Sequence, residues 1–253
     1  MTVTVDVWFD FICPYSLITR HVLAKALHGQ DAAPAFHPFE VNPNCVEEAG
    51  EYPRGVWENS VRPLGAERGV HLAGPPGTPL RRARMALLGY QYAREHGAGA
   101  RYTDLVFGAY FHHWQDISDP TVLAGLAVEA GLDRAGFRAA IMSARYARAH
   151  QQSLAHARGP AQVTMVPVIV AGQRRIDGVP TADELTRAVE EAIAAAAAPS
   201  VPSVPSVPAV PAGPGAGAGQ GLWDMTTPAP PGVALPAAVP KPLPGTRTRL
   251  HGT

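Results

Sequence analysis

The sequence has 253 residues, of which 46% are hydrophobic and 17% are charged, a balance typical of one large or two small globular domains. Lysine plus arginine and aspartate plus glutamate both number 21, so there is no net basic charge for binding nucleic acid. No apolar run reaches the roughly 20 residues of a membrane-spanning helix, and the N-terminus lacks the pattern of a secretory signal. We therefore expect a cytoplasmic protein with no nucleic-acid or membrane partner, and its two cysteines fit a reducing compartment.

The N-terminal segment predicts a buried strand followed directly by a helix. Apolar residues alternate over Val3–Phe9, and the run then becomes apolar on both faces, as in a strand at the centre of a sheet. Over Tyr15–Leu27 the apolar residues recur with helical spacing. Pro14 falls at the first helical position, where its missing N–H needs no partner. Cys13 is therefore expected at a strand-to-helix junction.

Cys13 is the candidate nucleophile of the chain. The free N–H groups and the dipole at a helix start stabilise an anion, so we expect a lowered thiol pKa and a larger thiolate fraction. The thiolate is the form that attacks a disulfide or an electrophilic carbon. The alternative is a small buried cysteine that only fills space. Asp10 would raise the thiol pKa by its charge, and we expect it to be a solvated residue at the strand end.

Strand and helix signals continue to about residue 197. A helix connects the first two predicted strands, so these strands should be parallel. Thr181, followed by Glu184 three residues later, forms a capping box that predicts a helix start. The expected elements are a second strand Ala35–Val41, helices within about 45–160, a β-hairpin of Val166–Val170 and Arg174–Ile176, and a last helix from Thr181 to about Ala197.

Residues 198–253 differ in composition from the rest of the chain. They hold half of its 26 prolines, few charges and a repeated Val-Pro-Ser pattern. Such a segment favours polyproline II and cannot bury a core. We expect a folded domain over 1–197 and a disordered Pro/Ala/Gly-rich tail over 198–253. Its one apolar island, L-W-D-M at residues 222–225, is interpreted as incidental, with a docking peptide as the alternative.

Two motifs resemble the DsbA-like thioredoxin superfamily. The segment F-D-F-I-C-P-Y-S, residues 9–16, is similar to the active-site segment of FrnE-type DsbA oxidoreductases and of their cousins, the 2-hydroxychromene-2-carboxylate isomerases and kappa-class glutathione transferases. The segment T-M-V-P-V-I-V, residues 164–170, resembles the strand that carries the cis-proline of the superfamily. The resemblance covers about Val3–Ala197. It implies an α/β thioredoxin-like fold with a central mixed sheet and a large helical insertion at about 45–160.

The tetrapeptide Cys13-Pro14-Tyr15-Ser16 combines features of two groups. The FrnE type usually carries Cys-Pro-x-Cys, whereas the isomerases and kappa transferases carry Ser-Pro-Tyr-Ser. The resemblance therefore implies a monothiol site with Cys13 and Ser16 as catalytic residues. The Ser16 hydroxyl would hydrogen-bond the thiolate and keep it charged; the alternative is that it satisfies an N–H group at the helix start.

The resemblance also implies a substrate-binding set of Pro14, Tyr15, Val166 and Pro167. Pro167 would be the cis-proline, and the backbone of Val166 would bind an extended thiol substrate by strand-like hydrogen bonds. Tyr15 would shape the pocket or offer a phenolic proton, with simple packing as the alternative. Cys45 follows the second predicted strand, so it is a candidate resolving thiol, provided that its Cα lies within roughly 7 Å of the Cα of its partner.

Three functions remain open. The first is a thiol-disulfide oxidoreductase that forms a mixed disulfide with a protein or small-molecule substrate. The second is a glutathione-dependent isomerase or transferase, which Tyr15-Ser16 favour and Cys13 counts against. The third is a non-catalytic binding module. We expect no metal and no tightly bound cofactor, with glutathione or another low-molecular-weight thiol as candidate cosubstrate; the oligomeric state is open, a homodimer included.

Overall fold

The computed structural model describes residues 2–41, 54–72, 74–76 and 82–198, all within one compact unit, Met1–Val201. Cys45 and nearly all of the predicted tail lie outside the described residues. The strands are β1 (Val3–Phe9), β2 (Ala32–Pro38), β3 (Val168–Ala171) and β4 (Arg174–Asp177). The helices are α1 (Pro14–Ala26), α2 (Arg54–Val56), the π-helix η1 (Trp57–Val61), α3 (Arg62–Glu67), α4 (Arg84–Glu95), α5 (Gly99–Phe111), α6 (Pro120–Glu129), α7 (Arg134–Ile141), α8 (Ala144–Arg158) and α9 (Ala182–Ala197).

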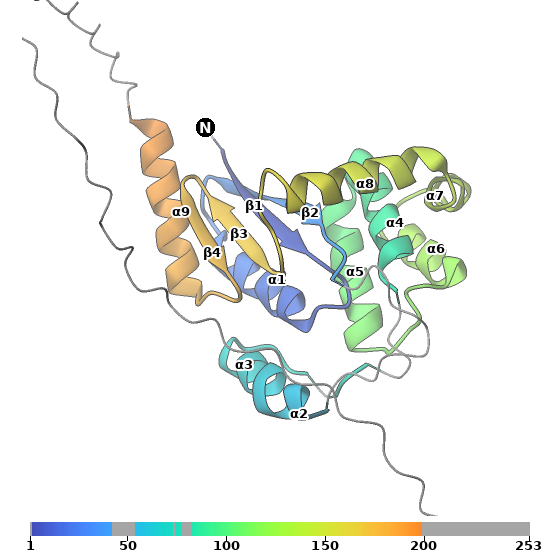
Figure 1. The fold of residues 1–253 in the computed structure, drawn as a ribbon, viewed down its shortest axis with the longest axis horizontal. Helices are drawn as coiled ribbons and strands as arrows, with labels where there is room; N and C mark the ends of the chain where they lie inside the picture. Colours follow the sequence, from blue (N-terminus) through green and yellow to red (C-terminus); the bar gives the residue numbers. More distant parts are fainter. Residues whose placement is uncertain (1, 42–53, 73, 77–81, 199–253) are drawn as a thin grey trace, which may run out of the picture. The chain divides into compact units, whose positions relative to one another are not determined.

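The sheet is mixed, with strand order β2-β1-β3-β4. β1 and β2 are parallel, as predicted from the intervening helix, whereas β1 pairs antiparallel with β3 and β3 antiparallel with β4. β1 is therefore a central strand, which explains why its sequence becomes apolar on both faces. The expected α/β fold, with a mixed sheet and a helical insertion, is confirmed (Figure 1).

The second strand begins and ends three residues earlier than predicted. It pairs with β1 from Val3 opposite Ala32 to Phe9 opposite Pro38, and a strand can continue only as far as its partner does. Beyond that point, the N–H of Phe39 still reaches the carbonyl of Phe9 at 2.8 Å. The chain then leaves the sheet. The residues after β2 therefore lie beside the start of α1.

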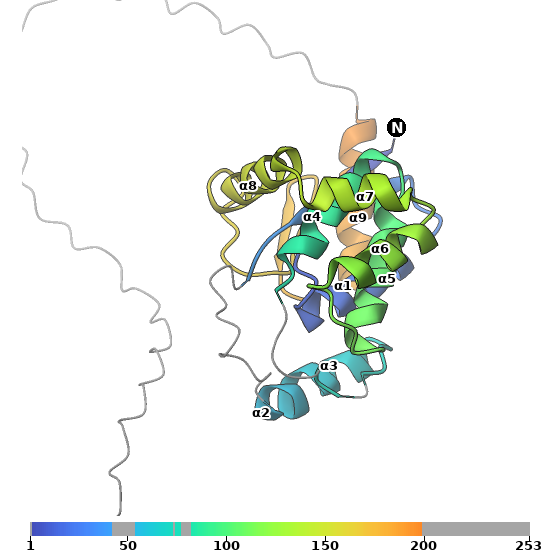
Figure 2. The ribbon, with the colours of Figure 1, turned by 90° about the vertical axis from the view of Figure 1, so that its right-hand side faces the viewer.

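The helical insertion forms a layer that meets the sheet along β2. Within it, helix α4 packs against α5, α7 and α8, and α8 also contacts β2 (Figures 1 and 2). Helices α1 and α9 pack together, and α9 lies against β1 and β3. The predicted cap of the last helix is confirmed, because the Thr181 hydroxyl accepts the Glu184 N–H at 3.1 Å. Among the described helices, none combines the length and the apolar character needed to cross a bilayer.

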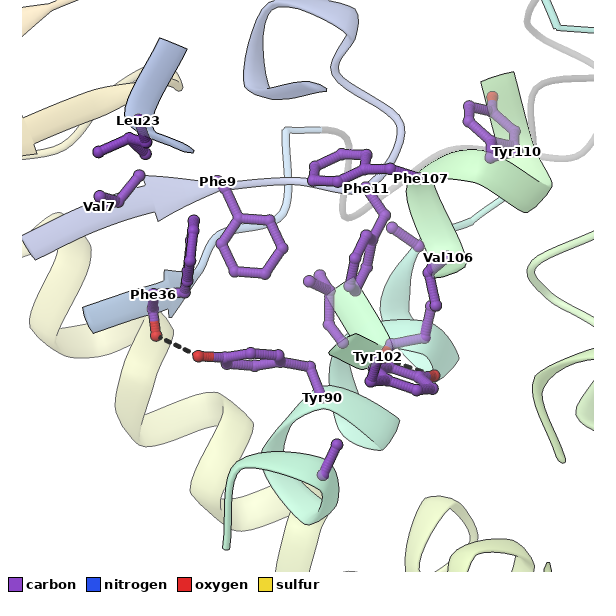
Figure 3. Close-up of a cluster of buried hydrophobic side chains, with 14 of the residues drawn as sticks. Val7, Phe9, Phe11, Leu23, Phe36, Tyr90, Tyr102, Val106, Phe107 and Tyr110 are labelled. Atoms are coloured by element: carbon purple, nitrogen blue, oxygen red, sulfur yellow. Dashed lines mark hydrogen bonds between the residues drawn. The ribbon is translucent and has the colours of Figure 1, made fainter. Parts of the chain in front are cut away.

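An aromatic cluster joins the end of β1 to the insertion (Figure 3). Phe9 meets Tyr90 of α4 edge-on at 5.3 Å between ring centroids, and Phe11 meets Phe107 of α5 at 5.2 Å. The Tyr90 hydroxyl donates to the carbonyl of Phe36 at 3.0 Å, so the buried phenol keeps a hydrogen bond. These contacts fix the chain on both sides of Asp10, immediately before the strand-to-helix junction.

We expect Gly89→Ala to destabilise the protein, because three helices meet at this residue of α4. A Cβ added there would lie 2.6 Å from the Phe137 Cζ of α7, and also too close to the Tyr102 hydroxyl of α5. Overpacking of this kind lowers the free energy of unfolding by about 1–3 kcal/mol. Gly108→Ala is the matched control, because Gly108 is helical and its added Cβ meets nothing within 4 Å. The free energy of unfolding of the control should rise by up to about 1 kcal/mol from helix propensity. Urea titration measures the free energy of unfolding of both variants, and equal changes in the two would contradict the packing account.

Candidate active site

Cys13 lies at the junction that the sequence predicted. β1 ends at Phe9, Pro14 opens α1, and Cys13 is the N-cap residue, with extended backbone angles of φ −91° and ψ 112°. Its N–H donates to the carbonyl of Asp10 at 3.1 Å, which closes the tight turn between strand and helix. Its own carbonyl accepts the N–H of Ser16 at 3.0 Å, the first bond of the helix.

The thiol meets the second motif of the sequence. Cys13 Sγ donates to the carbonyl oxygen of Val166 at 3.5 Å, although the two residues are 153 positions apart. The Val166–Pro167 peptide bond is cis, as the resemblance implied. β3 brings these residues to the thiol, because Val168 at its start pairs with Trp8 near the end of β1. The two short motifs therefore form one site.

The expected lowering of the thiol pKa is wrong. Burial raises the pKa of Cys13 to about 11, although hydrogen bonds from the Ser16 side chain and from the N–H groups of Ser16 and Tyr15 act to lower it. Removing a thiolate from water disfavours the anion more than the helix start favours it. The residue is only 9% exposed and packs in a small apolar cluster apart from the main core. The other buried members of this cluster are Trp8, Phe39, Ala157, Val163, Val166 and Val168.

Ser16 is positioned to act on the thiol, one turn into α1. It is 3% exposed, its hydroxyl accepts the N–H of Asp10 at 3.4 Å, and its hydrogen bond to Cys13 lowers the thiol pKa. The N–H that it accepts belongs to the turn before the helix rather than to the helix start. The catalytic role of Ser16 stays a prediction.

Tyr15 connects the thiol-bearing helix to the insertion. Its hydroxyl lies 2.8 Å from the Ser60 hydroxyl of η1, and the side chain is half-buried. This contact holds the Tyr15 side chain against η1, and its two predicted roles, shaping the pocket and offering a phenolic proton, stay predictions. Pro14 is buried at the first position of α1.

Asp10 is not the solvated residue that we expected from the sequence. It is 1% exposed, and its carboxylate accepts the N–H of Ile12 at 3.2 Å and the N–H of Val41 at 2.8 Å. Burial raises the pKa of this carboxyl to about 7, and the negative charge of Glu40 also raises it, whereas hydrogen bonds from the backbone N–H groups of Val41, Ile12 and Phe11 act to lower it. The apolar residues on both sides of Asp10 were the sequence signal for a buried position.

Glu40 and His150 form a buried pair that sequence reasoning missed. His150 Nε2 lies 2.7 Å from Glu40 Oε1, and the side chains are 0% and 6% exposed. His150 comes from the middle of α8 and Glu40 from the exit of β2, so no local pattern links them. Within the described ranges, no group of three or more His, Cys, Asp or Glu residues could hold a metal ion.

A mixed sheet of this order, with a cysteine at the start of its first helix and a cis-proline against the thiol, defines a thioredoxin-fold protein. The chain belongs to the DSBA-like thioredoxin domain family, whose sequence profile matches residues 4–190. It is 30% identical over 198 residues to the uncharacterized protein YwbO of Bacillus subtilis. The aligned region covers 76% of this chain and 98% of YwbO.

Solved structures share this fold at low sequence identity. A probable DsbA oxidoreductase from Streptomyces coelicolor is 22% identical with a TM-score of 0.63, over 76% of this chain and 90% of that one. A 2-hydroxychromene-2-carboxylate isomerase is 18% identical with a TM-score of 0.61, over 76% and 95%. The cytosolic disulfide reductase DsbM from Pseudomonas aeruginosa, solved with GSH, is 15% identical with a TM-score of 0.57, over 77% and 97%. At these sequence identities, the similarity concerns the fold alone.

Proposed function

We propose that the protein is a DsbA-family, FrnE-like thiol-disulfide oxidoreductase that works with a single thiol, Cys13. The observation that carries this proposal is the contact between Cys13 Sγ and the Val166 carbonyl, 3.5 Å apart. It places the nucleophile beside a backbone group that an extended disulfide substrate can use for hydrogen bonding. Membership of the DSBA-like family supports the same chemistry.

The proposed reaction has three exchange steps. The Cys13 thiolate attacks one sulfur of the substrate disulfide, so that a mixed disulfide forms and the other substrate sulfur leaves as a thiolate. A low-molecular-weight thiol, such as glutathione, then attacks the substrate sulfur of the mixed disulfide, so that Cys13 leaves as a thiolate and a substrate–glutathione disulfide forms. A second glutathione attacks the glutathione sulfur of that disulfide, which releases the second substrate thiol and glutathione disulfide. Two electrons therefore pass from two glutathione thiols to the substrate disulfide. Cys45, outside the described residues, remains the candidate for resolving the mixed disulfide from within the chain.

The surroundings of the thiol suit a polypeptide or small-molecule disulfide. Met165, directly before Val166, is 73% exposed, and Val41 is 51% exposed. The Val41 N–H binds Asp10, so Val41 lies near the thiol-bearing turn. A substrate that bonds to the Val166 carbonyl would displace the S–H donor from it, and this frees the sulfur for attack. A cycle closed by a small thiol requires a reducing compartment, in keeping with the proposed cytoplasmic location.

One observation favours the glutathione-dependent isomerase or transferase as a second candidate. A thiol with a pKa of about 11 is protonated at neutral pH, and its S–H group lies 3.5 Å from the Val166 carbonyl oxygen as a hydrogen-bond donor. Such a group could donate a hydrogen bond to the thiolate of bound glutathione. In that case Cys13 would position the cofactor and form no covalent bond to it.

Mass spectrometry after mild oxidation with glutathione disulfide tests the oxidoreductase proposal. We expect one glutathione bound through Cys13 in the Cys45→Ser variant, released again by added glutathione, because Cys13 is then the only thiol. The full chain with both cysteines would give either the same adduct or a Cys13–Cys45 disulfide peptide, and the second result would assign Cys45 as the resolving thiol. Absence of any adduct, together with no disulfide turnover, would contradict the proposal and leave the isomerase or the binding module.

A further inference from the structure

The segment that brings Val166 to the thiol, residues 161–167, is called here the pre-β3 segment, and its middle has no hydrogen-bond ladder of its own. Among the described residues, none accepts a hydrogen bond from the N–H groups of Thr164, Met165 or Val166. Thr164 and Met165 are exposed, and Val166 is buried. A segment outside a ladder keeps a fixed conformation only through contacts at its ends and with other elements. The position of Val166 therefore depends on those contacts.

The edge strand β4 holds the pre-β3 segment at both ends (Figure 1). At the start, Arg175 Nη1 donates to the carbonyl of Ala161 at 2.6 Å, and its Nη2 donates to the carbonyl of Gln162 at 3.2 Å. At the end, the N–H of Gly178, directly after β4, donates to the carbonyl of Pro167 at 2.9 Å. The anchors therefore lie on either side of the residues that would face a substrate.

Asp177 sets the direction in which the Arg175 guanidinium points. The Asp177 carboxylate accepts hydrogen bonds from Arg175 Nε at 3.2 Å and from its Nη2 at 3.0 Å. A guanidinium is planar and carries its donors in a fixed fork, so a carboxylate on one edge directs the remaining donors. The two side chains are largely exposed, and an exposed ion pair contributes little stability by itself. Its effect is to aim Arg175 at the two carbonyls.

Gln162 shows why this anchor is needed. Its φ is +49°, in the left-handed region that residues with a Cβ rarely adopt. Such a conformation persists where the surroundings fix it, and Arg175 binds the carbonyls on both sides of this residue's N–Cα bond. The next residue, Val163, is 1% exposed, donates its N–H to the carbonyl of Ala157 at 2.7 Å and belongs to the apolar cluster of the thiol. A change at Arg175 therefore reaches the thiol site through two adjacent residues.

We propose that Arg175 is a positioning residue for the pre-β3 segment, and that it makes the site selective for disulfides carried by an extended polypeptide. An extended chain binds along several backbone groups of the segment, whereas a small disulfide contacts fewer of them. Fixing these groups before binding lowers the entropy cost of ordering them with the substrate. The selectivity rests on the proposed function, but the positioning of the segment does not.

Amide hydrogen exchange of the Val163 N–H, followed by NMR in the full chain, tests the positioning. Arg175→Met removes every donor and keeps the length of the side chain, and we expect the Val163 N–H to exchange about tenfold faster, because hydrogen bonds from a charged group are lost. Arg174→Met is the matched control, because Arg174 lies on the opposite face of β4, where it lines a hollow against α9. Equal exchange rates in the two variants would overturn the proposal.

Two further variants distinguish positioning from a general loosening of the fold. Arg175→Lys keeps the charge but lacks the planar fork, so its exchange rate should lie between those of the parent and Arg175→Met. Asparagine adopts the left-handed region more readily than glutamine, so adding Gln162→Asn to Arg175→Met should slow the exchange again by about threefold. A lysine variant identical to the parent would overturn the role of the fork. No recovery with Gln162→Asn would overturn the link through Gln162.

Steady-state kinetics with two disulfides test the selectivity. One substrate is a short extended peptide whose cysteine forms a mixed disulfide with glutathione, and the other is hydroxyethyl disulfide. We expect Arg175→Met to raise the KM for the peptide about tenfold and to change its kcat by less than about twofold, because binding along the segment is weakened. The KM for hydroxyethyl disulfide should rise less. Equal effects on the two substrates, or a loss confined to kcat, would overturn the selectivity.

The exchange measurement needs no substrate, so its outcome is independent of turnover. Faster exchange in Arg175→Met, without disulfide turnover by the parent protein, would leave the positioning intact and refute the proposed function. Turnover by the parent protein, with the exchange rate and the KM unchanged in Arg175→Met, would refute this inference and leave the proposed function intact.

Discussion

Replacement of Cys13 by serine is expected to lower the rate of disulfide reduction by at least about a thousandfold. A serine hydroxyl remains protonated at neutral pH and cannot displace a thiolate from a disulfide, whereas the cysteine sulfur can. The substitution changes one atom at a position that is only 9% exposed, so the fold should persist. The measurement is the rate of glutathione-dependent reduction of a small disulfide, with unfolding followed in parallel.

The same variant separates the two candidate enzymes. Cys13→Ser gives the tetrapeptide Ser-Pro-Tyr-Ser, which the isomerases and kappa transferases carry. Glutathione-dependent isomerase or transferase activity should therefore be kept or increased in this variant if the cofactor's thiol does the chemistry. Cys45→Ser serves as the control for loss of a thiol elsewhere in the chain. Disulfide reduction that survives Cys13→Ser would contradict the assignment of Cys13 as nucleophile.

The stability difference between the parent protein and Asp10→Asn is expected to change strongly with pH. Burial raises the pKa of Asp10 from 3.8 to about 7, which corresponds to on the order of 4 kcal/mol. The folded-state pKa lies above the unfolded value, so the neutral carboxyl contributes stability that is complete below pH 3.8. This contribution is lost as the pH rises through about 7. Asparagine cannot ionise, so the free energy of unfolding of the variant should rise relative to that of the parent between about pH 4 and pH 7. Above pH 7 the difference should stay constant.

A loss of stability in Asp10→Asn that is the same at every pH does not affect this test. The asparagine amide has one acceptor oxygen where the carboxylate has two, so it leaves the N–H of Ile12 or of Val41 unpaired at all pH values. The quantity to measure is therefore the change of the stability difference with pH, from urea titrations at several pH values. Asp133→Asn is the matched control, because Asp133 is exposed and its carboxylate also accepts a backbone N–H, from Gly136 at 2.6 Å. A stability difference that is flat with pH for Asp10→Asn would show that the carboxyl is solvated after all.

The order of helices and strands in this protein could be predicted from the sequence, because local residue patterns determine it. Alternating apolar residues predicted β1, and Pro14 at the first helical position placed Cys13 at the junction. The capping box at Thr181 predicted the start of α9. The end of β2 was misplaced, because it is set by the end of its partner strand rather than by its own residues. The cis state of the Val166–Pro167 bond came from a family resemblance, since a Val-Pro sequence by itself favours trans.

The sequence by itself determined where the thiol lies along the chain and which residues flank it, and the family resemblance added that a distant Val-Pro segment belongs to its site. Only the tertiary structure decided the chemistry of the thiol. Burial in an apolar cluster reverses the expected direction of the Cys13 pKa shift. Glu40 and His150, 110 positions apart, form a buried pair that no local pattern links. The physical reason is that desolvation and the interaction of charges depend on what surrounds a group in space, and the residues that surround Cys13, Asp10 and Glu40 come from segments that meet only when the chain has folded.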